Sequence, residues 1–294
     1  MKHILWIMAM TILTAACSNN GENIIGKNNP EIRDGKLTPE VLWAFGRIGN
    51  VQVSPDGKKI LYSVSYYSVA EDKSNAELFV MNVDGTEKQQ ITNTAVKETA
   101  AKWMNDNEHI AFLSAKSGSM QLWIMNAQGD DRKQITKIEG GISDFLFSPD
   151  ESKLLFVADV KYGERTVDKH PDLPKSTGII VTDLMYKHWD EWVQTVPHPF
   201  VVDFQNDEVG TPKDLLEGEP FESPMKPWGG IEQLAWSPDK QTIAYTCRKK
   251  TGQEYAFSTN SDIYFYDLKT GKSKNVTEGM MGYDQNPVFS PDGQ

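Results

Sequence analysis

Histidines and carboxylates, the side chains from which many metal sites are built, gather in one stretch of this chain. The stretch holds three of the five histidines together with several acidic residues: His170, Asp172, His188, Asp190, Glu191 and His198. Imidazole and carboxylate groups are ordinary ligands of zinc and other transition metals. No pair of these residues combines helical ligand spacing with a defined third ligand. The favoured prediction is therefore no metal and no cofactor, with these polar groups solvated or bonded to backbone.

Motifs for nucleophilic or phosphate chemistry are also missing from the sequence. The nearest approach to a Gly-x-Ser-x-Gly nucleophile turn, residues 141–145, lacks the second glycine and reads as the start of a strand. No phosphate-binding loop, His-Glu-x-x-His motif, dinucleotide fingerprint or paired Cys-x-x-Cys occurs. Cys247 ends an apolar strand and is interpreted as a small core residue. We therefore expect no catalytic residue within this chain.

A recurring pattern defines the elements that must position any site. Residues 78–92 (LFVMNVDGTEKQQIT) return about 44 residues later as 122–136 (LWIMNAQGDDRKQIT), and again as 263–277 (IYFYDLKTGKSKNVT). Each copy predicts a strand of β-branched and aromatic residues, a turn rich in Gly, Asn or Asp, and a short polar strand. A period in the forties is typical of propeller blades.

A Ser-Pro-Asp turn adds a second hairpin to the unit, at residues 54–57, 148–150, 237–239 and 290–293. Proline presets φ at the second turn position, and aspartate bonds its own backbone. Apolar strands flank each of these turns. The repeat unit therefore has four antiparallel strands, which is the architecture of a propeller blade.

The predicted fold class is all-β, an incomplete β-propeller of about four four-stranded antiparallel blades and the start of a fifth. The blades are expected at residues 51–92, 100–136, 142–218 and 231–277, and the fifth begins within 285–294. Because a propeller closes to remove its strand edges, the incomplete fifth blade predicts a longer protein. The whole segment 37–294 is expected to be this partial propeller.

Two helices are expected beside the blades. A short N-terminal helix begins at Pro39, with Thr38 as its cap. In blade three, residues 159–199 are inserted between two strands, and long insertions in compact domains are usually functional or disordered. Within this insertion Tyr186, Trp189 and Trp192 recur at helical spacing, which predicts a short helix over residues 183–193.

The N-terminal residues 1–17 have the pattern of a secretory signal, because a basic start precedes an apolar run that is too short to span a membrane. Cys17 follows two alanines, as in the lipobox of bacterial lipoproteins, which implies lipidation at Cys17. Thr14 stands where that motif usually has leucine, so ordinary signal cleavage remains an alternative. Residues 18–36 are expected to be a flexible tether. These features predict export, to the periplasm or as a membrane-anchored lipoprotein of a Gram-negative bacterium.

The net charge of the chain limits the kinds of molecule that it is expected to bind. The chain has a formal net charge of −11 at pH 7 and a pI of about 5.0. This acidity argues against nucleic acid or anionic lipid headgroups as the main partner. A soluble acidic surface is the simpler interpretation of the charge.

Three segments resemble the propeller domains of the prolyl oligopeptidase family of serine peptidases, in particular dipeptidyl-peptidase 5-like and acylaminoacyl-peptidase-like enzymes. They are residues 37–64, the insertion DLMYKHWDEWV at 183–193, and YTCRKKTGQEYAFSTNSDIYFYDL at 245–268. The last two are the more specific. The resemblance implies a C-terminal α/β-hydrolase domain with a Ser–Asp–His triad, and nothing in this chain matches that domain.

The same resemblance implies which residues contact substrate. In related dipeptidyl peptidases, acidic residues on a propeller excursion bind the free amino terminus, so Asp190 and Glu191 are the candidates here. Trp189 and Trp192 would form apolar walls, and Arg248 could face a substrate carbonyl or carboxylate. The alternative is that Asp190 and Glu191 are a solvated face, and that Arg248 lies at the surface beside two lysines.

The implied function is the substrate-gating and selecting propeller of a secreted serine peptidase that cleaves dipeptides or acyl-aminoacyl groups from short peptides. An alternative is a non-catalytic periplasmic propeller that serves as a protein-interaction module, as in Tol-type envelope proteins. A weaker alternative is an enzyme such as a lyase, with its site in the central channel. That site would need converging His or acidic residues, and His109 is the only histidine in a blade strand region.

Overall fold

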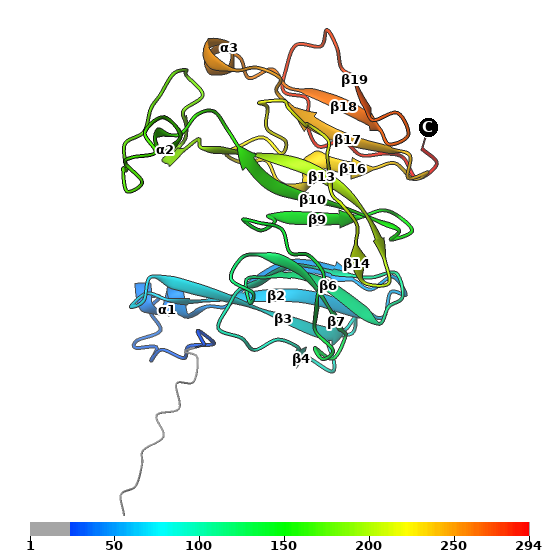
Figure 1. Cartoon of the computed structure of the whole chain (residues 1–294). Coiled ribbons are helices and arrows are strands. Elements are labelled where there is room, and N and C mark those ends of the chain that lie inside the picture. Colours follow the sequence, from blue (N-terminus) through cyan, green and yellow to red (C-terminus); the bar gives the residue numbers. More distant parts are fainter. Residues whose placement is uncertain (1–23, 294) are drawn as a thin grey trace, which may run out of the picture.

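Within the part of the chain that the structure describes, four large antiparallel sheets follow one another in chain order (Figure 1), and two short strands form a separate two-stranded sheet. The computed structural model describes residues 24–293. The first sheet contains β1 (Arg47–Val53), β2 (Lys59–Ser68), β3 (Lys73–Asn82) and β4 (Gln89–Gln90). The second contains β5 (Glu98–Trp103), β6 (His109–Ser114), β7 (Gln121–Asn126) and β8 (Lys133–Gln134). Both are simple meanders in which each strand pairs with the next.

The third and fourth sheets repeat this plan with additions. The third contains β9 (Asp144–Phe147), β10 (Lys153–Lys161), β13 (Thr195–Gln205), β14 (Glu208–Val209) and β15 (Lys213–Asp214). The fourth contains β16 (Leu234–Trp236), β17 (Thr242–Cys247), β18 (Asp262–Asp267) and β19 (Lys272–Asn275), and a 3-10 helix η1 (Ile231–Gln233) precedes it. The predicted all-β fold of four-stranded antiparallel blades is confirmed. Residues 285–293, expected to begin a fifth blade, form no strand.

The predicted N-terminal helix is present as α1 (Pro39–Ala44). Thr38 is its N-cap, and the Thr38 hydroxyl accepts a hydrogen bond from the backbone N–H of Val41 at 3.4 Å. Proline at the first helical position requires no backbone donor there. Thr38 and Pro39 therefore fix the start of the helix, as expected.

The helix predicted over residues 183–193 is wrong. This segment folds instead as the small hairpin of β11 (Lys187–His188) and β12 (Glu191–Trp192), in which Lys187 pairs with Trp192. Trp189 in the turn has φ of 55°, in the left-handed region that interrupts a right-handed helix. The described helices of the insertion and of the loop facing it are α2 (Thr166–Lys169) and α3 (Gly252–Phe257).

The Ser-Pro-Asp turns share one hydrogen-bond plan. In the first turn the Ser54 hydroxyl donates to Asp56 Oδ1 at 2.7 Å and accepts from the Lys59 backbone N–H at 2.9 Å. The same two bonds recur in the third and fourth sheets, around Ser148 and Ser237. Each turn thus satisfies its own backbone within the hairpin and sets the register of the strands on either side.

A threonine closes three of the four sheets in the same way. Thr92 lies after β4, and its hydroxyl accepts from the Leu78 backbone N–H at 2.8 Å and donates to Glu77 Oε2 at 2.6 Å. In the second and fourth sheets the equivalent pairs are Thr136 with Gln121 and Thr277 with Asp262. This shared tether explains why the repeat ends in Ile-Thr or Val-Thr.

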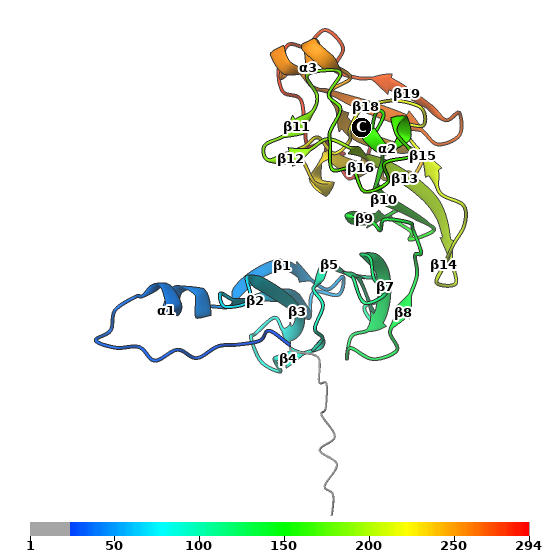
Figure 2. The same ribbon diagram turned by 60° about the vertical axis from the view of Figure 1, so that its left-hand side comes forward.

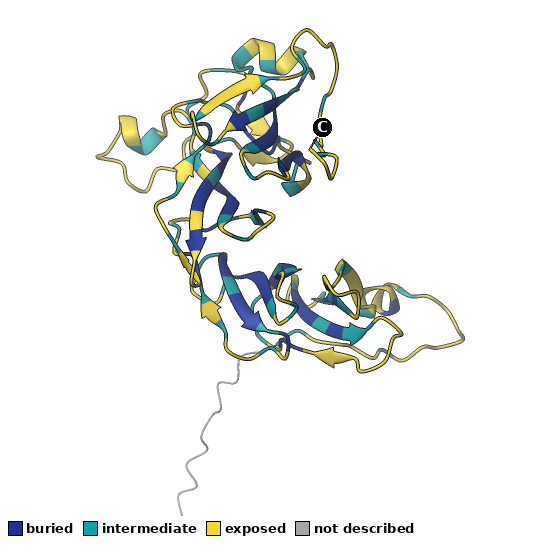
Figure 3. Cartoon of the chain, turned by 90° about the vertical axis from the view of Figure 1, so that its right-hand side faces the viewer, coloured by how far each residue is buried: buried dark blue, intermediate teal, exposed yellow. Residues whose placement is uncertain are grey.

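Alternate residues of one strand pack against opposite neighbouring sheets, because strand side chains alternate between the two faces. In β6, Ile110 belongs to the apolar cluster shared with the first sheet, whereas Ala111 belongs to the cluster shared with the third. In β10, Leu154 faces the second sheet and Leu155 faces the fourth. The dark strands in Figure 3 mark these buried layers. The sheets follow an open arc (Figure 2).

Candidate substrate-binding site

The hairpin β11–β12 carries four of the five site residues predicted from the sequence. Trp189 and Asp190 form its turn, and Glu191 and Trp192 form its second strand. All four are exposed, Trp189 by 79% and Trp192 by 48%. Within the described residues 24–293, the carboxylates of Asp190 and Glu191 form no hydrogen bond or ion pair. Both carboxylates are therefore open to solvent or to a ligand.

The hairpin that carries these two carboxylates also carries exposed aromatic rings. Trp189 contacts Trp228 edge-on, with ring centroids 6.0 Å apart, and Trp228 is 81% exposed. In the same hairpin the Lys187 ammonium lies 4.7 Å from the centre of the Trp192 ring. Exposed aromatic pairs are a common feature of binding surfaces because they offer large apolar area at low entropic cost.

Beneath the hairpin lies a buried carboxylate that the sequence reasoning missed. Glu222 is 1% exposed, and both of its oxygens accept hydrogen bonds. His188 Nε2 of β11 lies 2.9 Å from Glu222 Oε2, and the Tyr255 hydroxyl of α3 donates to Glu222 Oε1 at 2.9 Å. The Tyr255 oxygen is also 3.4 Å from His188 Nδ1. Figure 2 shows α3 beside the hairpin.

The electrostatics of this cluster fix the role of Tyr255. Burial and the neighbouring Glu222 raise the pKa of Tyr255 well above its ordinary value of 10.0. Its hydroxyl therefore keeps its proton at neutral pH and acts as a donor. A carboxylate can only accept, so His188 presents a protonated Nε2 to Glu222. The two bonds close a bridge from the insertion to the fourth sheet.

Arg248, the fifth predicted residue, belongs to the same cluster. Its guanidinium carbon lies 3.8 Å from the centre of the Tyr255 ring, and Nη1 donates to the Ser258 carbonyl at 3.2 Å. Its Nε is buried and has no hydrogen-bond partner among the described residues. Arg248 is thus half-buried behind the hairpin, and it does not simply extend into solvent beside Lys249 and Lys250.

Ser223 explains why the neighbouring Glu222 is held at this depth. Its backbone N–H donates to the Pro197 carbonyl at 2.9 Å, and its hydroxyl donates to the Thr246 carbonyl at 2.8 Å. Pro197 lies in β13 and Thr246 in β17, so the segment is inserted between the third and fourth sheets. No spacing rule marks Glu222 in the sequence, since its depth arises from these distant contacts. The exposed hairpin that carries the predicted residues thus lies directly above the buried Glu222.

Cys247 is fully buried, and burial raises the pKa of its thiol far above the ordinary value, so it is an unreactive core residue. Over residues 24–293, no group of three or more His, Cys, Asp or Glu side chains could hold a metal ion. In that same part of the chain no helix is long and apolar enough to cross a membrane. Cys17 lies outside the described residues.

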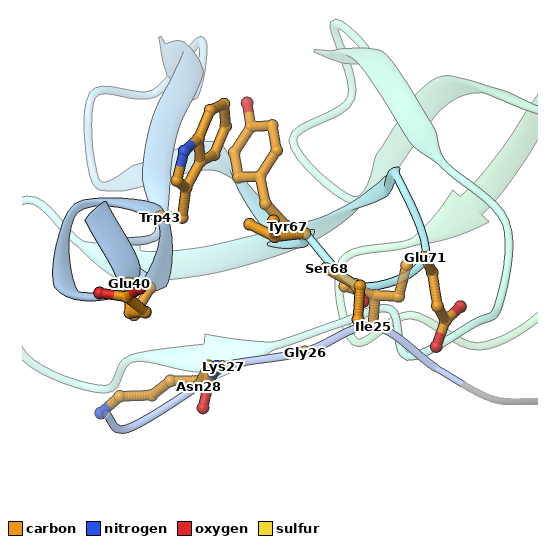
Figure 4. Close-up of a pocket in the computed structure, with 12 residues that line it drawn as sticks. Ile25, Gly26, Lys27, Asn28, Glu40, Trp43, Tyr67, Ser68 and Glu71 are labelled. Atoms are coloured by element: carbon orange, nitrogen blue, oxygen red, sulfur yellow. The ribbon is translucent and has the colours of Figure 1, made fainter. Parts of the chain in front are cut away.

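A separate pocket of about 400 Å³ lies where residues 25–28 cross α1 and the end of β2 (Figure 4). Glu40, Trp43 and Tyr67 line it. The Arg47 guanidinium lies 4.6 Å from the Trp43 ring centre and 4.4 Å from that of Tyr67. This stacking fixes α1 against the first sheet. None of the residues predicted to contact substrate lines this pocket.

The repeated antiparallel sheets agree with the protein family that the sequence matches. Residues 40–187 match the family described as the TolB beta propeller domain, and the chain belongs to that family.

Within this class, the chain is similar along its length to dipeptidyl-peptidase 5. It is 53% identical over 293 residues to that protein of Porphyromonas gingivalis, an alignment that covers 100% of this chain and 42% of the relative. It is 48% identical over 258 residues to the enzyme of Porphyromonas endodontalis, covering 88% of this chain and 37% of the relative. The chain thus spans less than half the length of these relatives. The predicted resemblance to dipeptidyl-peptidase 5-like enzymes is confirmed.

Solved structures agree on the fold. An acylaminoacyl peptidase in complex with Z-Gly-Gly-Phe-chloromethyl ketone superposes with a TM-score of 0.58 at 13% identity, covering 81% of this chain and 33% of that one. The Pyrococcus horikoshii acylaminoacyl peptidase gives a TM-score of 0.56 at 14% identity, covering 80% and 33%. At these identities the similarity concerns the fold alone.

Proposed function

We propose that this chain is the substrate-gating and selecting propeller of a secreted serine peptidase that removes dipeptides or acyl-aminoacyl groups from short peptides. The observation that carries this proposal is the 53% identity to dipeptidyl-peptidase 5 over the whole chain. The exposed hairpin supports it, because its carboxylates and aromatic rings suit a peptide that ends in a free amino group. Hydrolysis would be acyl transfer to a serine outside this chain.

In this proposal the acidic residues recognise the charge of the substrate and the tryptophans recognise its shape. Asp190 and Glu191 accept charge-assisted hydrogen bonds from the substrate ammonium group. Trp189 and Trp192 form the apolar walls, and Trp228 extends the wall beside Trp189. Arg248, whose buried Nε has no hydrogen-bond partner among the described residues, would face a carbonyl or carboxylate of the bound peptide.

Binding of tetra-alanine to the chain, measured by titration calorimetry, tests this proposal. The free peptide should bind more tightly than its N-acetylated form, because acetylation removes the ammonium charge. Asp190→Asn and Glu191→Gln should each weaken binding of the free peptide by about tenfold or more. Asp172→Asn, an exposed acid elsewhere in the insertion, is the matched control and should leave the affinity unchanged. Equal affinity for the free and acetylated peptides would contradict the proposal.

The cellular location is part of the same proposal. Residues 1–17 act as a signal, Cys17 carries the lipid anchor, and residues 18–36 link the propeller to the periplasmic face of a Gram-negative membrane. Mass spectrometry of the mature protein checks this, because lipidation leaves a modified Cys17 as the first residue. An unmodified N-terminus at any position would contradict lipidation.

Membership of the TolB propeller family favours one alternative, a non-catalytic module that binds other proteins. Such a module has no need to distinguish a free amino terminus. It predicts that envelope proteins bind the chain with an affinity that Asp190→Asn and Glu191→Gln leave unchanged. The calorimetric comparison therefore separates the two functions.

A further inference from the structure

The two more specific segments of the family resemblance, residues 183–193 and 245–268, meet in the folded structure. His188 comes from the inserted hairpin and Tyr255 from α3, and they are 67 residues apart in sequence. Glu222 joins them from a third segment, which lies between the third and fourth sheets. The three segments do not pair with one another as strands. They are therefore joined at this point by one buried carboxylate.

We propose that Glu222, His188 and Tyr255 form a positioning bridge, which holds the hairpin β11–β12 on the fourth sheet and so places its exposed side chains. The hairpin has little else to hold it. Each of its strands is two residues long, and the two strands pair only with each other. An isolated two-stranded hairpin of this length is not stable in water, so its position must come from contacts outside its own strands.

Few other contacts reach this hairpin from the rest of the fold. Met185, just before β11, is 2% exposed and anchors its base. Asp183 accepts from the Tyr162 hydroxyl at 3.3 Å, also at the base. Toward the turn, the Trp189–Trp228 contact joins two side chains that are each largely exposed. The bonds of His188 are therefore the buried polar contacts nearest to the turn.

Burial makes the bridge strong and specific. Glu222 has no access to water, so a lost partner leaves an unsatisfied buried oxygen, which costs far more than a bond at the surface. The histidine side chain is 11% exposed and aligned by the same carboxylate. Arg248 stacks on Tyr255 and is thus positioned by the bridge as well. Glu222, His188 and Tyr255 therefore act by positioning the hairpin and Arg248. We do not place any of the three in contact with the peptide.

The inference about substrate affinity rests on the proposed function, whereas the inference about hairpin position does not. Glu222→Gln keeps the size of the side chain but removes its charge. Tyr255→Phe keeps the ring under Arg248 and removes only the hydroxyl, so it separates the bridge from the stacking. Glu217→Gln, an exposed acid in the same loop, is the matched control.

Amide hydrogen exchange over residues 183–194 is the primary measurement, made on the complete chain. Tyr255→Phe and Glu222→Gln should each speed exchange of these amides by about tenfold, while amides of β6 and β17 keep their rates. The control variant should match the original protein. Unchanged exchange of the hairpin amides in Tyr255→Phe would overturn the bridge, and this variant decides the matter even if Glu222→Gln does not fold.

Calorimetry with tetra-alanine then tests the consequence for binding. We expect the affinity to fall by about tenfold in the variants whose hairpin exchanges faster. Faster exchange with unchanged affinity would show that the bridge does not position the peptide site, and would leave the proposed function intact. If the original protein binds no tetra-alanine, the proposed function fails, and the exchange rates still decide whether the bridge positions the hairpin.

Discussion

Buried polar side chains decide much of this structure at the scale of single residues. Glu77, Glu98 and Glu222 are each 1% exposed, yet they are acidic. Glu77 and Glu222 tolerate burial because neighbours satisfy both of their oxygens. Glu98 is different, because Oε2 has no partner among the described residues although Arg132 Nη1 lies 3.2 Å from Oε1. The three buried acids should therefore affect the free energy of unfolding in different ways, which can be measured.

Thr92→Val should destabilise the fold by about 1–3 kcal/mol, because it leaves Glu77 Oε2 and the Leu78 N–H without their shared partner in a buried site. Urea denaturation measures the change in the free energy of unfolding. Thr211→Val, at an exposed loop position, is the control and should change it by less than about 0.5 kcal/mol. Equal effects of the two substitutions would show that the tether contributes nothing.

Glu98 should give the unfolding free energy a particular pH dependence. Burial raises the pKa of Glu98 above 4.5, although Thr92 and Arg132 act in the opposite direction. The folded state then binds this proton more tightly than the unfolded state, so the charged form costs stability above the folded pKa. That cost disappears as the pH falls through the folded pKa toward 4.5.

Glu98→Gln removes this proton uptake. Between pH 7.5 and 4.5, the original protein should therefore gain stability relative to Glu98→Gln, as measured by urea denaturation at both pH values. Glu208→Gln, an exposed acid in β14, should show no such relative change. A relative loss of stability on acidification would contradict the assigned direction of the pKa shift.

At the scale of elements, the turns depend on one backbone conformation. The residue after each Ser-Pro-Asp turn has positive φ: Gly57 at 74°, Glu151 at 56°, Lys240 at 63° and Gly293 at 74°. Two of these residues are glycine, which adopts this region at no steric cost. The turns at Glu151 and Lys240 retain the conformation because the serine and aspartate bonds hold the loop on either side.

Gly57→Ala should cost about 1 kcal/mol of stability. A Cβ there meets no atom within 4 Å, so the cost is backbone strain alone. Gly26→Ala is a matched control, since a Cβ at Gly26 is equally free and its φ is not in the left-handed region. Thermal denaturation compares the two variants. If they melt alike, the turn conformation is not under the strain we assign to it.

Some of these elements were predictable from the sequence and others were not. The strands were predictable because Ile110 and Ala111 alternate between two apolar layers, and because the Ser-Pro-Asp turns carry their own bonds. The hairpin was not predictable. The helical spacing of Tyr186, Trp189 and Trp192 normally marks a buried face, but these rings are exposed. The hairpin instead makes a distant contact, the bond from His188 to Glu222, which no local pattern encodes.

At the scale of the whole molecule, stability is shared between neighbouring sheets. Each inner sheet contributes one face to the cluster before it and the other face to the cluster after it. Repeat folds of this kind owe their cooperativity to such nearest-neighbour interfaces. A substitution at either face of β10 should therefore weaken the same cooperative transition.

Leu154→Ala and Leu155→Ala test this coupling, because both side chains are fully buried but face different sheets. Each should lower the free energy of unfolding by about 2–5 kcal/mol within a single calorimetric transition. Leu173→Ala, at a leucine that is 52% exposed, should have little effect. Two separate transitions, of which each substitution shifts only one, would contradict the shared interface.

The most direct test of the central claim is a crystal structure of this chain with tetra-alanine bound. We expect the peptide amino group on the hairpin β11–β12, within about 3 Å of a carboxylate oxygen of Asp190 or Glu191, with Trp189 or Trp192 against the peptide. A peptide bound on another face, or with its amino group away from both carboxylates, would contradict the claim that this propeller selects substrates by their free amino terminus.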